Sequence, residues 1–403
     1  MMIINSVIIV VLGYFSSGQI SQFILKDSSF SNIIFYCFLI SAFEALLVLP
    51  MSIARINSKP VLYTIINVSN LLLNLSLQLY FIYVLNSEFG FIFLAKFIAP
   101  AVIFVLCIPY VLKNIQFEID FTEIKNILRF SFPMMLAMLM SMLLNSVDRF
   151  ILADFVTKQE VAVYTIGYSI GSVTNAFILA PFTLAMNVIF WKKIKDDNFT
   201  RFMTKSSTYL FTVMIFVSVI ITFILPYAIK IFVKNDLLWS SMYIIPFILF
   251  SNCFLALFIF PSQDLYHKRK THVIMYIVSV CLLFNVIANI LLIKYFGIYA
   301  AAGVTVLSSL LMIIIAYKIV KGFTFTKFEL AKIILLSFIF LINAYLSFQF
   351  QQENIYLDVI IKLLLIFLSI LILYVFRFFE PVEKESIKGF FNKYLFRIFN
   401  KNT

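Results

Sequence analysis

Charged side chains are scarce in this sequence. Only 12% of its 403 residues are Asp, Glu, Lys or Arg, whereas a soluble protein usually has about a quarter. Hydrophobic residues make up 63% of the chain, and the mean hydropathy is +1.04. A soluble globular fold is excluded, because the charges are too few to cover its surface. The solvent around most of this chain is therefore lipid.

Glycine, histidine and cysteine are also rare. The 9 Gly residues form no glycine-rich phosphate loop, so the chain has no site of its own for hydrolysing ATP. The 2 His and 4 Cys have neither metal-ligand spacing nor paired spacing, and no nucleophile elbow occurs. We expect a protein that is not an enzyme, with no metal, no cofactor and no disulfide.

What the sequence does contain is a series of apolar runs, each about twenty residues long. Lipid cannot hydrogen-bond the backbone, so a spanning segment must be a helix or belong to a closed barrel. Barrel strands alternate apolar and polar residues, and these runs do not. We predict an all-α integral membrane protein with about twelve transmembrane helices, in two related bundles around a central cavity. The expected spans are 3–24, 30–53, 61–85, 89–112, 131–153, 161–190, 206–229, 240–262, 272–293, 298–317, 333–349 and 356–376.

The positions of Lys and Arg predict the orientation. One set of alternate connections, together with the C-terminal tail, holds about 23 of the 31 Lys and Arg residues, and the opposite set holds about 5. Basic residues stay on the cytoplasmic side. We therefore expect a multi-pass protein of the bacterial inner membrane with both termini in the cytoplasm. This bias also explains the net charge of +12 without a nucleic-acid partner.

An internal repeat relates residues 50–90 to residues 261–297. In each copy a basic connection follows a proline-ended helix, and the next helix has two amides four residues apart. The aligned pairs are Pro50 with Pro261, Lys59 with Lys270, Asn74 with Asn285, and Gln78 with Asn289.

Both copies run in the same direction through the membrane, so they are parallel repeats of the kind from which transporters build two rocking bundles. We divide the chain into an N-terminal bundle of four helices at 1–129 and a C-terminal bundle of six at 130–322. Two extra helices and a basic cytoplasmic tail occupy 323–403.

We single out four charged residues inside the predicted spans, namely Glu44, Lys96, Asp148 and Arg149. A charge at the bilayer centre costs about 2.5–3.5 kcal/mol on insertion scales, so each needs a cavity or a partner. The cationic residues would suit an anionic substrate, and Glu44 would suit coupling to H⁺ or Na⁺. A structural ion pair or a snorkelling side chain is the alternative for each. The amides of the two repeats would contact sugar hydroxyls or tie helices together.

Three stretches around the fifth and sixth spans are similar to a known family. They are Leu128–Pro133, Ser146–Leu152 and Val161–Tyr168, with a weaker match at Asn289–Ala302. They resemble the Wzx-type O-antigen and polysaccharide flippases of the multidrug/oligosaccharidyl-lipid/polysaccharide exporter superfamily. The resemblance extends over about residues 30–320.

The resemblance implies a flippase that translocates an undecaprenyl-diphosphate-linked oligosaccharide, an O-antigen or capsule repeat unit, by ion-coupled alternating access. Asp148 and Arg149 match the family motif, whereas Lys96 and Glu44 rest on membrane chemistry alone. The implied partners are the lipid-linked oligosaccharide, membrane lipids, a polysaccharide polymerase and a chain-length regulator. The family usually has two further N-terminal helices, so we expect an N-terminal bundle of four helices where six are usual.

Two other functions stay open at this point. A multidrug or cation antiporter of the same superfamily would prefer acidic residues in its cavity. A polysaccharide polymerase would need a large periplasmic loop, and every outward connection predicted here is short. The sequence predicts neither the sugar nor the coupling ion.

Overall fold

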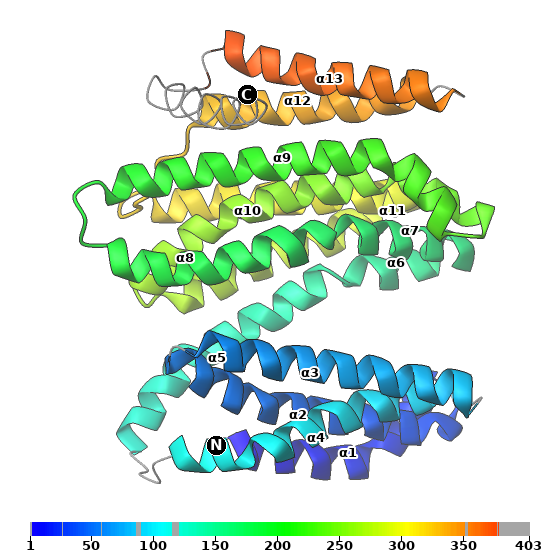
Figure 1. Ribbon diagram of the computed structural model, residues 1–403, viewed down its shortest axis with the longest axis vertical. Coiled ribbons are helices and arrows are strands. Elements are labelled where there is room, and N and C mark those ends of the chain that lie inside the picture. The colour runs from blue at the N-terminus through cyan, green and yellow to red at the C-terminus, as the bar shows by residue number, and fades with distance from the viewer. Residues whose placement is uncertain are drawn as a thin grey trace, which may run out of the picture. The chain divides into compact units, whose positions relative to one another are not determined.

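The computed structural model in Figure 1 describes residues 2–25, 27–57, 59–85, 90–114, 121–350, 354–376 and 378. Within these ranges the regular structure is helical throughout, which confirms the predicted all-α class. Eleven stretches of the described residues are long and apolar enough to cross a membrane. Contacts divide the chain into two units, Met1–Asp120 and Phe121–Thr403. The division at 1–129, 130–322 and 323–403 stays a prediction.

The first unit has four long helices, and small residues bring the first two together. The described buried side chains of the first helix are Ser6, Ser17 and Ser21, besides Gly13. The Ser6 hydroxyl donates to the Ala42 carbonyl at 3.1 Å. In lipid no hydrophobic effect drives two helices together. Helices there usually associate through close packing of small residues. The helices are α1 (Met2–Leu25), α2 (Ser31–Ile56), α3 (Pro60–Leu79) and α4 (Gly90–Asn114).

The second unit contains the remaining helices. In two places, α5 with α6 and α7 with α8, two consecutive helices together form one candidate membrane pass. A turn at Asn145 and Ser146 separates α5 from α6, where the sequence predicted one unbroken span at 131–153. A π-helical turn at Asn175–Leu179 joins α7 to α8. The helices are α5 (Phe121–Leu144), α6 (Val147–Phe155), α7 (Lys158–Gly171), α8 (Ala180–Lys193), α9 (Phe199–Phe232), α10 (Ile245–His267), α11 (Thr271–Val320), α12 (Leu330–Gln349) and α13 (Ile355–Val375).

The 50-residue segment α11 folds back on itself at Gly297. This residue has φ 56° and ψ −137°, a conformation that glycine adopts without steric penalty. Asn285 Nδ2 donates to Ser308 Oγ at 3.0 Å, although 23 residues of straight helix would separate them by about 35 Å. The segment is therefore a helical hairpin that makes two passes. The eleven stretches thus make twelve passes among the described residues, the number predicted from the sequence.

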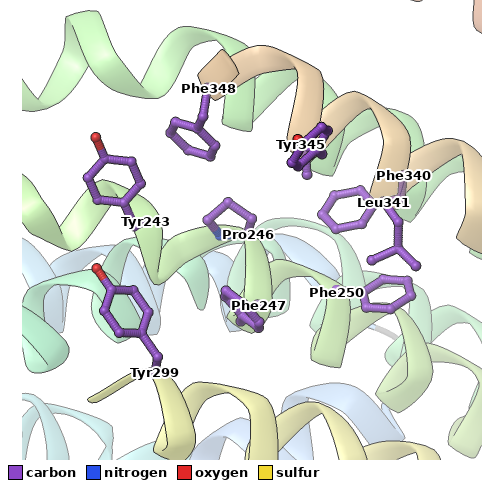
Figure 2. A pocket seen from close by; sticks show the side chains of 10 residues that line it. Tyr243, Pro246, Phe247, Phe250, Tyr299, Phe340, Leu341, Tyr345 and Phe348 are labelled. Atoms are coloured by element: carbon purple, nitrogen blue, oxygen red, sulfur yellow. The ribbon is translucent and has the colours of Figure 1, made fainter. Parts of the chain in front are cut away.

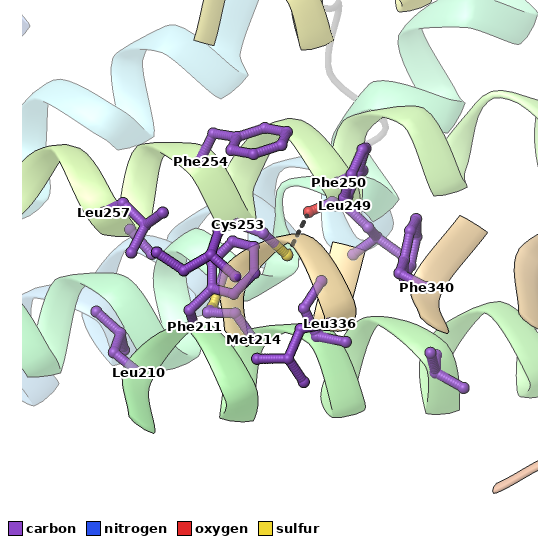
Figure 3. Packing of buried hydrophobic residues seen from close by; sticks show 14 of the residues in the cluster. Leu210, Phe211, Met214, Leu249, Phe250, Cys253, Phe254, Leu257, Leu336 and Phe340 are labelled. Atoms are coloured by element: carbon purple, nitrogen blue, oxygen red, sulfur yellow. Dashed lines mark hydrogen bonds between the residues drawn. The ribbon is translucent and has the colours of Figure 1, made fainter. Parts of the chain in front are cut away.

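The core of the second unit lies where α9, α10 and α12 pack together (Figure 3). Phe211 and Met214 of α9, Leu249 of α10 and Leu336 and Phe340 of α12 are all almost fully buried. Because this core is much more extensively buried than the first unit's, the second unit provides the firmer scaffold for a site.

Helix α13 contains a buried ion pair, and both members of the pair also form hydrogen bonds with α9. Lys362 Nζ lies 2.6 Å from Asp358 Oδ2 and donates to the Phe223 carbonyl at 3.0 Å. The Tyr227 hydroxyl also donates to Asp358. The pair is 1% and 5% exposed, so each charge depends on the other within the membrane. The sequence analysis did not single out these two residues, although their spacing of four on a predicted span was the available signal.

Glu329 ties the start of α12 to α9 outside the membrane-spanning segments. Its carboxylate accepts from Lys205 Nζ at 3.0 Å and from Thr208 Oγ1 at 2.7 Å, and it lies 3.1 Å from Lys332 Nζ. Burial raises the pKa of Glu329, but the bonds from Thr208, Lys205 and Lys332 outweigh it. They hold the pKa below the ordinary value of 4.5.

The lowered pKa predicts a pH-dependent contribution to stability. The ionised Glu329 stabilises the fold above its ordinary pKa, and this contribution is lost as the pH falls through the folded-state pKa. We expect Glu329→Gln to lower the thermal unfolding midpoint in detergent at pH 7 and to have a clearly smaller effect at a pH well below the ordinary pKa of 4.5. The exposed Asp197 provides the control Asp197→Asn, which should change neither value. A loss of equal size at both pH values would contradict the assignment.

The contact between α1 and α2 can be tested with a matched glycine pair. A Cβ added at Gly13 would lie 2.5 Å from Phe38 Cβ, whereas one at Gly18 would meet no atom within 4 Å. We expect Gly13→Ala to destabilise the protein by about 1–3 kcal/mol through overpacking. Gly18→Ala should be neutral or slightly stabilising, because alanine favours the helix. Thermal unfolding of the purified variants measures both, and equal midpoints would show that the helices do not approach this closely.

Candidate functional site

The two motifs that carry the family resemblance meet in the second unit. Asp148, in the first turn of α6, is 1% exposed. Its Oδ1 accepts from the Arg149 backbone N–H at 2.8 Å, and its Oδ2 accepts from the Tyr164 hydroxyl of α7. The Thr305 hydroxyl, from the returning arm of the α11 hairpin, lies beside Tyr164. The predicted site residue Asp148 is thus a buried brace that links α6 to α7.

Arg149 points to a different neighbour. Its guanidinium lies 4.2 Å from the ring centroid of Tyr168 and donates to the Asn145 carbonyl at 3.2 Å. The Tyr168 hydroxyl donates to the side-chain oxygen of Asn145 at 3.1 Å, which fixes the turn between α5 and α6. Successive residues of a helix point about 100° apart, so the acid and the base cannot share one partner. Arg149 stays partly exposed and keeps N–H donors for an anionic group.

The amides of the two repeats make the same hydrogen bond in each unit. Asn289 donates to Asn285 Oδ1 at 2.9 Å, and Gln78 donates to Asn74 Oδ1 at 2.5 Å. The pair in the second unit is at most 1% exposed and holds the α11 hairpin together. The pair in the first unit is partly exposed, so it alone has a polar edge that a ligand can reach.

The basic turns of the two repeats are also alike. Backbone N–H groups of Lys59 and Lys270 donate to the carbonyl five residues earlier, at 2.8 Å and 2.9 Å. The Lys59 ammonium lies 5.5 Å from the Tyr110 ring centroid, and that of Lys270 lies 5.2 Å from the Phe323 ring centroid. Equivalent lysines therefore have equivalent aromatic neighbours, as two copies of one structural repeat would.

Glu44 on α2 and Lys96 on α4 are exposed within the first unit. Lys96 Nζ lies 5.9 Å from the Phe93 ring centroid, and neither charge forms an ion pair among the described residues. The polar Ser41 precedes Glu44 by one turn and is exposed on the same face of α2. An unpaired charge is costly against hydrocarbon, so we expect this surface to line a path for water and polar ligands.

A pocket of about 470 Å³ lies in the second unit between α10, the Gly297 end of the α11 hairpin and α12 (Figure 2). Its walls are mostly aromatic, including Tyr243, Tyr299, Phe250 and Phe340, and none of its lining residues is charged. A site of this composition takes apolar groups, and it has no acid or base with which to do chemistry. None of the eight site residues predicted from the sequence lines it.

The long apolar helices of the two units define the chain as a multi-pass membrane protein. The family model described as "Polysaccharide biosynthesis protein" matches residues 1–206, and the MatE model matches residues 133–291. Since the first match covers half of the chain, the protein belongs to this family of polysaccharide biosynthesis proteins. The comparison with curated proteins gives no match.

Solved structures share the fold. The lipid II flippase MurJ in an inward closed conformation is 16% identical, with a TM-score of 0.60 over 85% of this chain and 72% of that chain. The MATE transporter VcmN of Vibrio cholerae in the bent form is 15% identical, with a TM-score of 0.54 over 80% of this chain and 78% of its own. The two family models, together with this shared fold, confirm the predicted resemblance to the exporter superfamily.

The brace between Asp148 and Tyr164 predicts a loss of stability when the tyrosine hydroxyl is removed. Tyr164→Phe leaves a buried carboxylate with one donor fewer, and we expect a cost of about 1.5–3 kcal/mol. The matched control is Tyr295→Phe, because Tyr295 is 74% exposed. Thermal unfolding in detergent measures both variants. If Tyr164→Phe were as stable as the control, the carboxylate would not depend on this bond.

Proposed function

We propose that this protein is a flippase for an undecaprenyl-diphosphate-linked oligosaccharide, an O-antigen or capsule repeat unit. It moves this substrate from the cytoplasmic to the periplasmic leaflet of the bacterial inner membrane, with both chain termini in the cytoplasm. The observation that carries the proposal is Lys96, which is exposed inside a membrane pass and forms no ion pair among the described residues. It lies in the region 1–206 that matches the polysaccharide biosynthesis family.

The chemistry of the substrate fits the polar groups that remain available. A diphosphate needs cationic donors along its path, and Lys96 and Arg149 both have free N–H groups. Sugar hydroxyls need both donors and acceptors, which the partly exposed amides of Asn74 and Gln78 provide. Few strong contacts are an advantage here, because a transported group has to leave as readily as it enters.

Coupling to an ion gradient would give the transport its direction, since the chain has no nucleotide site. Glu44 is our choice for the coupling group, because it is exposed, unpaired among the described residues, and able to hold H⁺ or Na⁺. Asp148 suits this role less well, because both of its oxygens already accept hydrogen bonds. We expect a polysaccharide polymerase and a chain-length regulator as partners, beside the lipid-linked oligosaccharide and membrane lipids.

A multidrug or cation antiporter is the second candidate. The MatE match over residues 133–291 and the shared fold with a MATE transporter favour it. Such a protein would bind cations at acidic groups, so it would depend on Glu44 and be indifferent to loss of a positive charge at Lys96.

Complementation of a bacterial strain that lacks its O-antigen flippase tests the proposal. We expect this chain to restore surface polysaccharide, and Lys96→Ala to reduce it by about 10-fold or more at equal expression, as loss of a charged hydrogen bond would. Lys96→Arg should retain most activity. Lys294→Ala is the control, because Lys294 is exposed near the Gly297 turn and is not placed on the path.

Two outcomes would count against a flippase. One is failure to restore polysaccharide in donor strains with several different repeat units. The other is drug resistance conferred by the chain and abolished by Glu44→Gln but not by Lys96→Ala, which would favour the antiporter.

A further inference from the structure

Asp264 is a buried carboxylate without a cationic partner. It lies in the last turn of α10 and is 0% exposed. Its Oδ2 accepts from the Thr324 hydroxyl at 2.6 Å, and the Phe325 backbone N–H also interacts with the carboxylate. Its Oδ1 is buried, with no hydrogen bond of ordinary geometry. Among the described residues, no Lys, Arg or His side chain lies within ion-pair distance of it. An ionised carboxylate in such a place needs a positive charge that the chain itself does not provide.

Two other buried polar atoms, one on the same helix end and one on the segment 324–326, are also unpartnered. Thr326 is 0% exposed, and its hydroxyl has no hydrogen-bond partner. Its backbone N–H donates to the Thr324 hydroxyl at 3.0 Å, so one hydroxyl joins Asp264 to this short segment. His267 follows Asp264 by one helical turn, its ring lies 5.8 Å from that of Phe325, and its Nδ1 is buried without a partner. These three orphaned atoms therefore belong to one helix end and the segment 324–326 that covers it.

The donor set selects the kind of ligand. A carboxylate and two hydroxyls are hard oxygen donors, which suit Na⁺ or K⁺ better than a softer transition metal. No group of three or more His, Cys, Asp or Glu suited to a metal occurs in the described part of the chain. The neighbouring cations Lys268, Arg269 and Lys270 are exposed in the turn after α10, so they attract anions outside and leave the carboxylate unpaired.

We propose that Asp264, Thr324 and Thr326 form a binding site for one monovalent metal cation, Na⁺ or K⁺. The cation would join the end of α10 to the segment that leads into α12. It would thereby fix the connection between the α11 hairpin and the two last helices. The site lies apart from the eight residues predicted from the sequence, and it does not depend on which substrate the protein transports.

A tryptophan beside the site provides the readout. The Trp191 ring centroid lies 5.6 Å from that of His267, and the chain has only one other tryptophan, Trp239. In the Trp239→Phe background, the purified full chain in detergent is titrated with NaCl or KCl, and choline chloride keeps the ionic strength constant. We expect a saturable change in Trp191 fluorescence, and a higher thermal unfolding midpoint, with Na⁺ or K⁺ but not with choline.

Two substitutions test the ligands separately. Asp264→Asn keeps an acceptor for Thr324 but removes the charge, and Thr326→Val removes only the orphaned hydroxyl. Each should weaken the apparent cation affinity by about 10-fold or more. Asp197→Asn removes an exposed carboxylate and should leave the affinity unchanged.

The proposal would be overturned by three results. The first is a response to Na⁺ and K⁺ no larger than the response to choline. The second is an unchanged affinity in Thr326→Val, which is informative even if Asp264→Asn does not fold. The third is a signal that follows pH, through Asp264 or His267, and not metal-ion concentration, because the carboxyl group would then be neutralised by a proton.

Discussion

Lipid offers no hydrogen bonds, so every polar group that enters the membrane must find its partner inside the protein. This constraint explains the uninterrupted helices and the way the chain turns. At Gly297 the backbone reverses within one residue, which lets the α11 hairpin make two passes with almost no unpaired backbone between them. The same constraint divides the polar side chains into two groups, those with a hydrogen-bond or ion-pair partner inside the protein and those without one.

Satisfied groups hold the structure together. Asp148 with Tyr164, Asn285 with Ser308, and Lys362 with Asp358 are buried pairs from neighbouring helices, from the two arms of the α11 hairpin, or from neighbouring turns of one helix. Removing one partner from such a pair leaves an uncompensated polar group, which costs more than the pair contributes. A motif can therefore recur in a family because its members need the brace, without any of its residues touching a substrate.

Unsatisfied groups are where function is expected. Lys96 and Glu44 are exposed charges in the membrane passes of the first unit, and Asp264 is a buried charge at the end of α10 in the second. For the first two we propose a position where water or a polar substrate meets them, and for the third a bound cation. In all three cases a charge without a partner in the protein suggests a ligand, and the surroundings of that charge determine which kind of ligand fits.

Much of the fold could be predicted from the sequence, because the spans and their orientation depend on local features, namely apolar runs and the positions of basic residues. The spans at 272–293 and 298–317 correspond to the two arms of the α11 hairpin, with Gly297 between them. The repeat was also visible locally, since Lys59 and Lys270 occupy matching positions.

Contacts between helices could not be predicted in the same way. Nothing in the sequence indicates that Asp148 meets Tyr164, because their contact depends on how α6 packs on α7. Asp264 could not be singled out, because it lies just beyond the predicted end of its span at 262 and its burial depends on contact with the segment 324–326. The different surroundings of Asp148 and Arg149 also depend on helix packing. The Asp148 side chain is buried, whereas the Arg149 side chain lies over the Tyr168 ring.

Transport by the purified protein tests the central claim most directly. The chain is reconstituted into liposomes with an undecaprenyl-diphosphate-linked oligosaccharide on both leaflets, and access of the sugar to an external glycosidase is followed over time. The account predicts that the inner half of the substrate becomes accessible with the wild-type chain and stays protected with Lys96→Ala. If the inner half stayed protected with the correctly folded wild-type chain, under imposed H⁺ and Na⁺ gradients and across several oligosaccharides, the account would be contradicted.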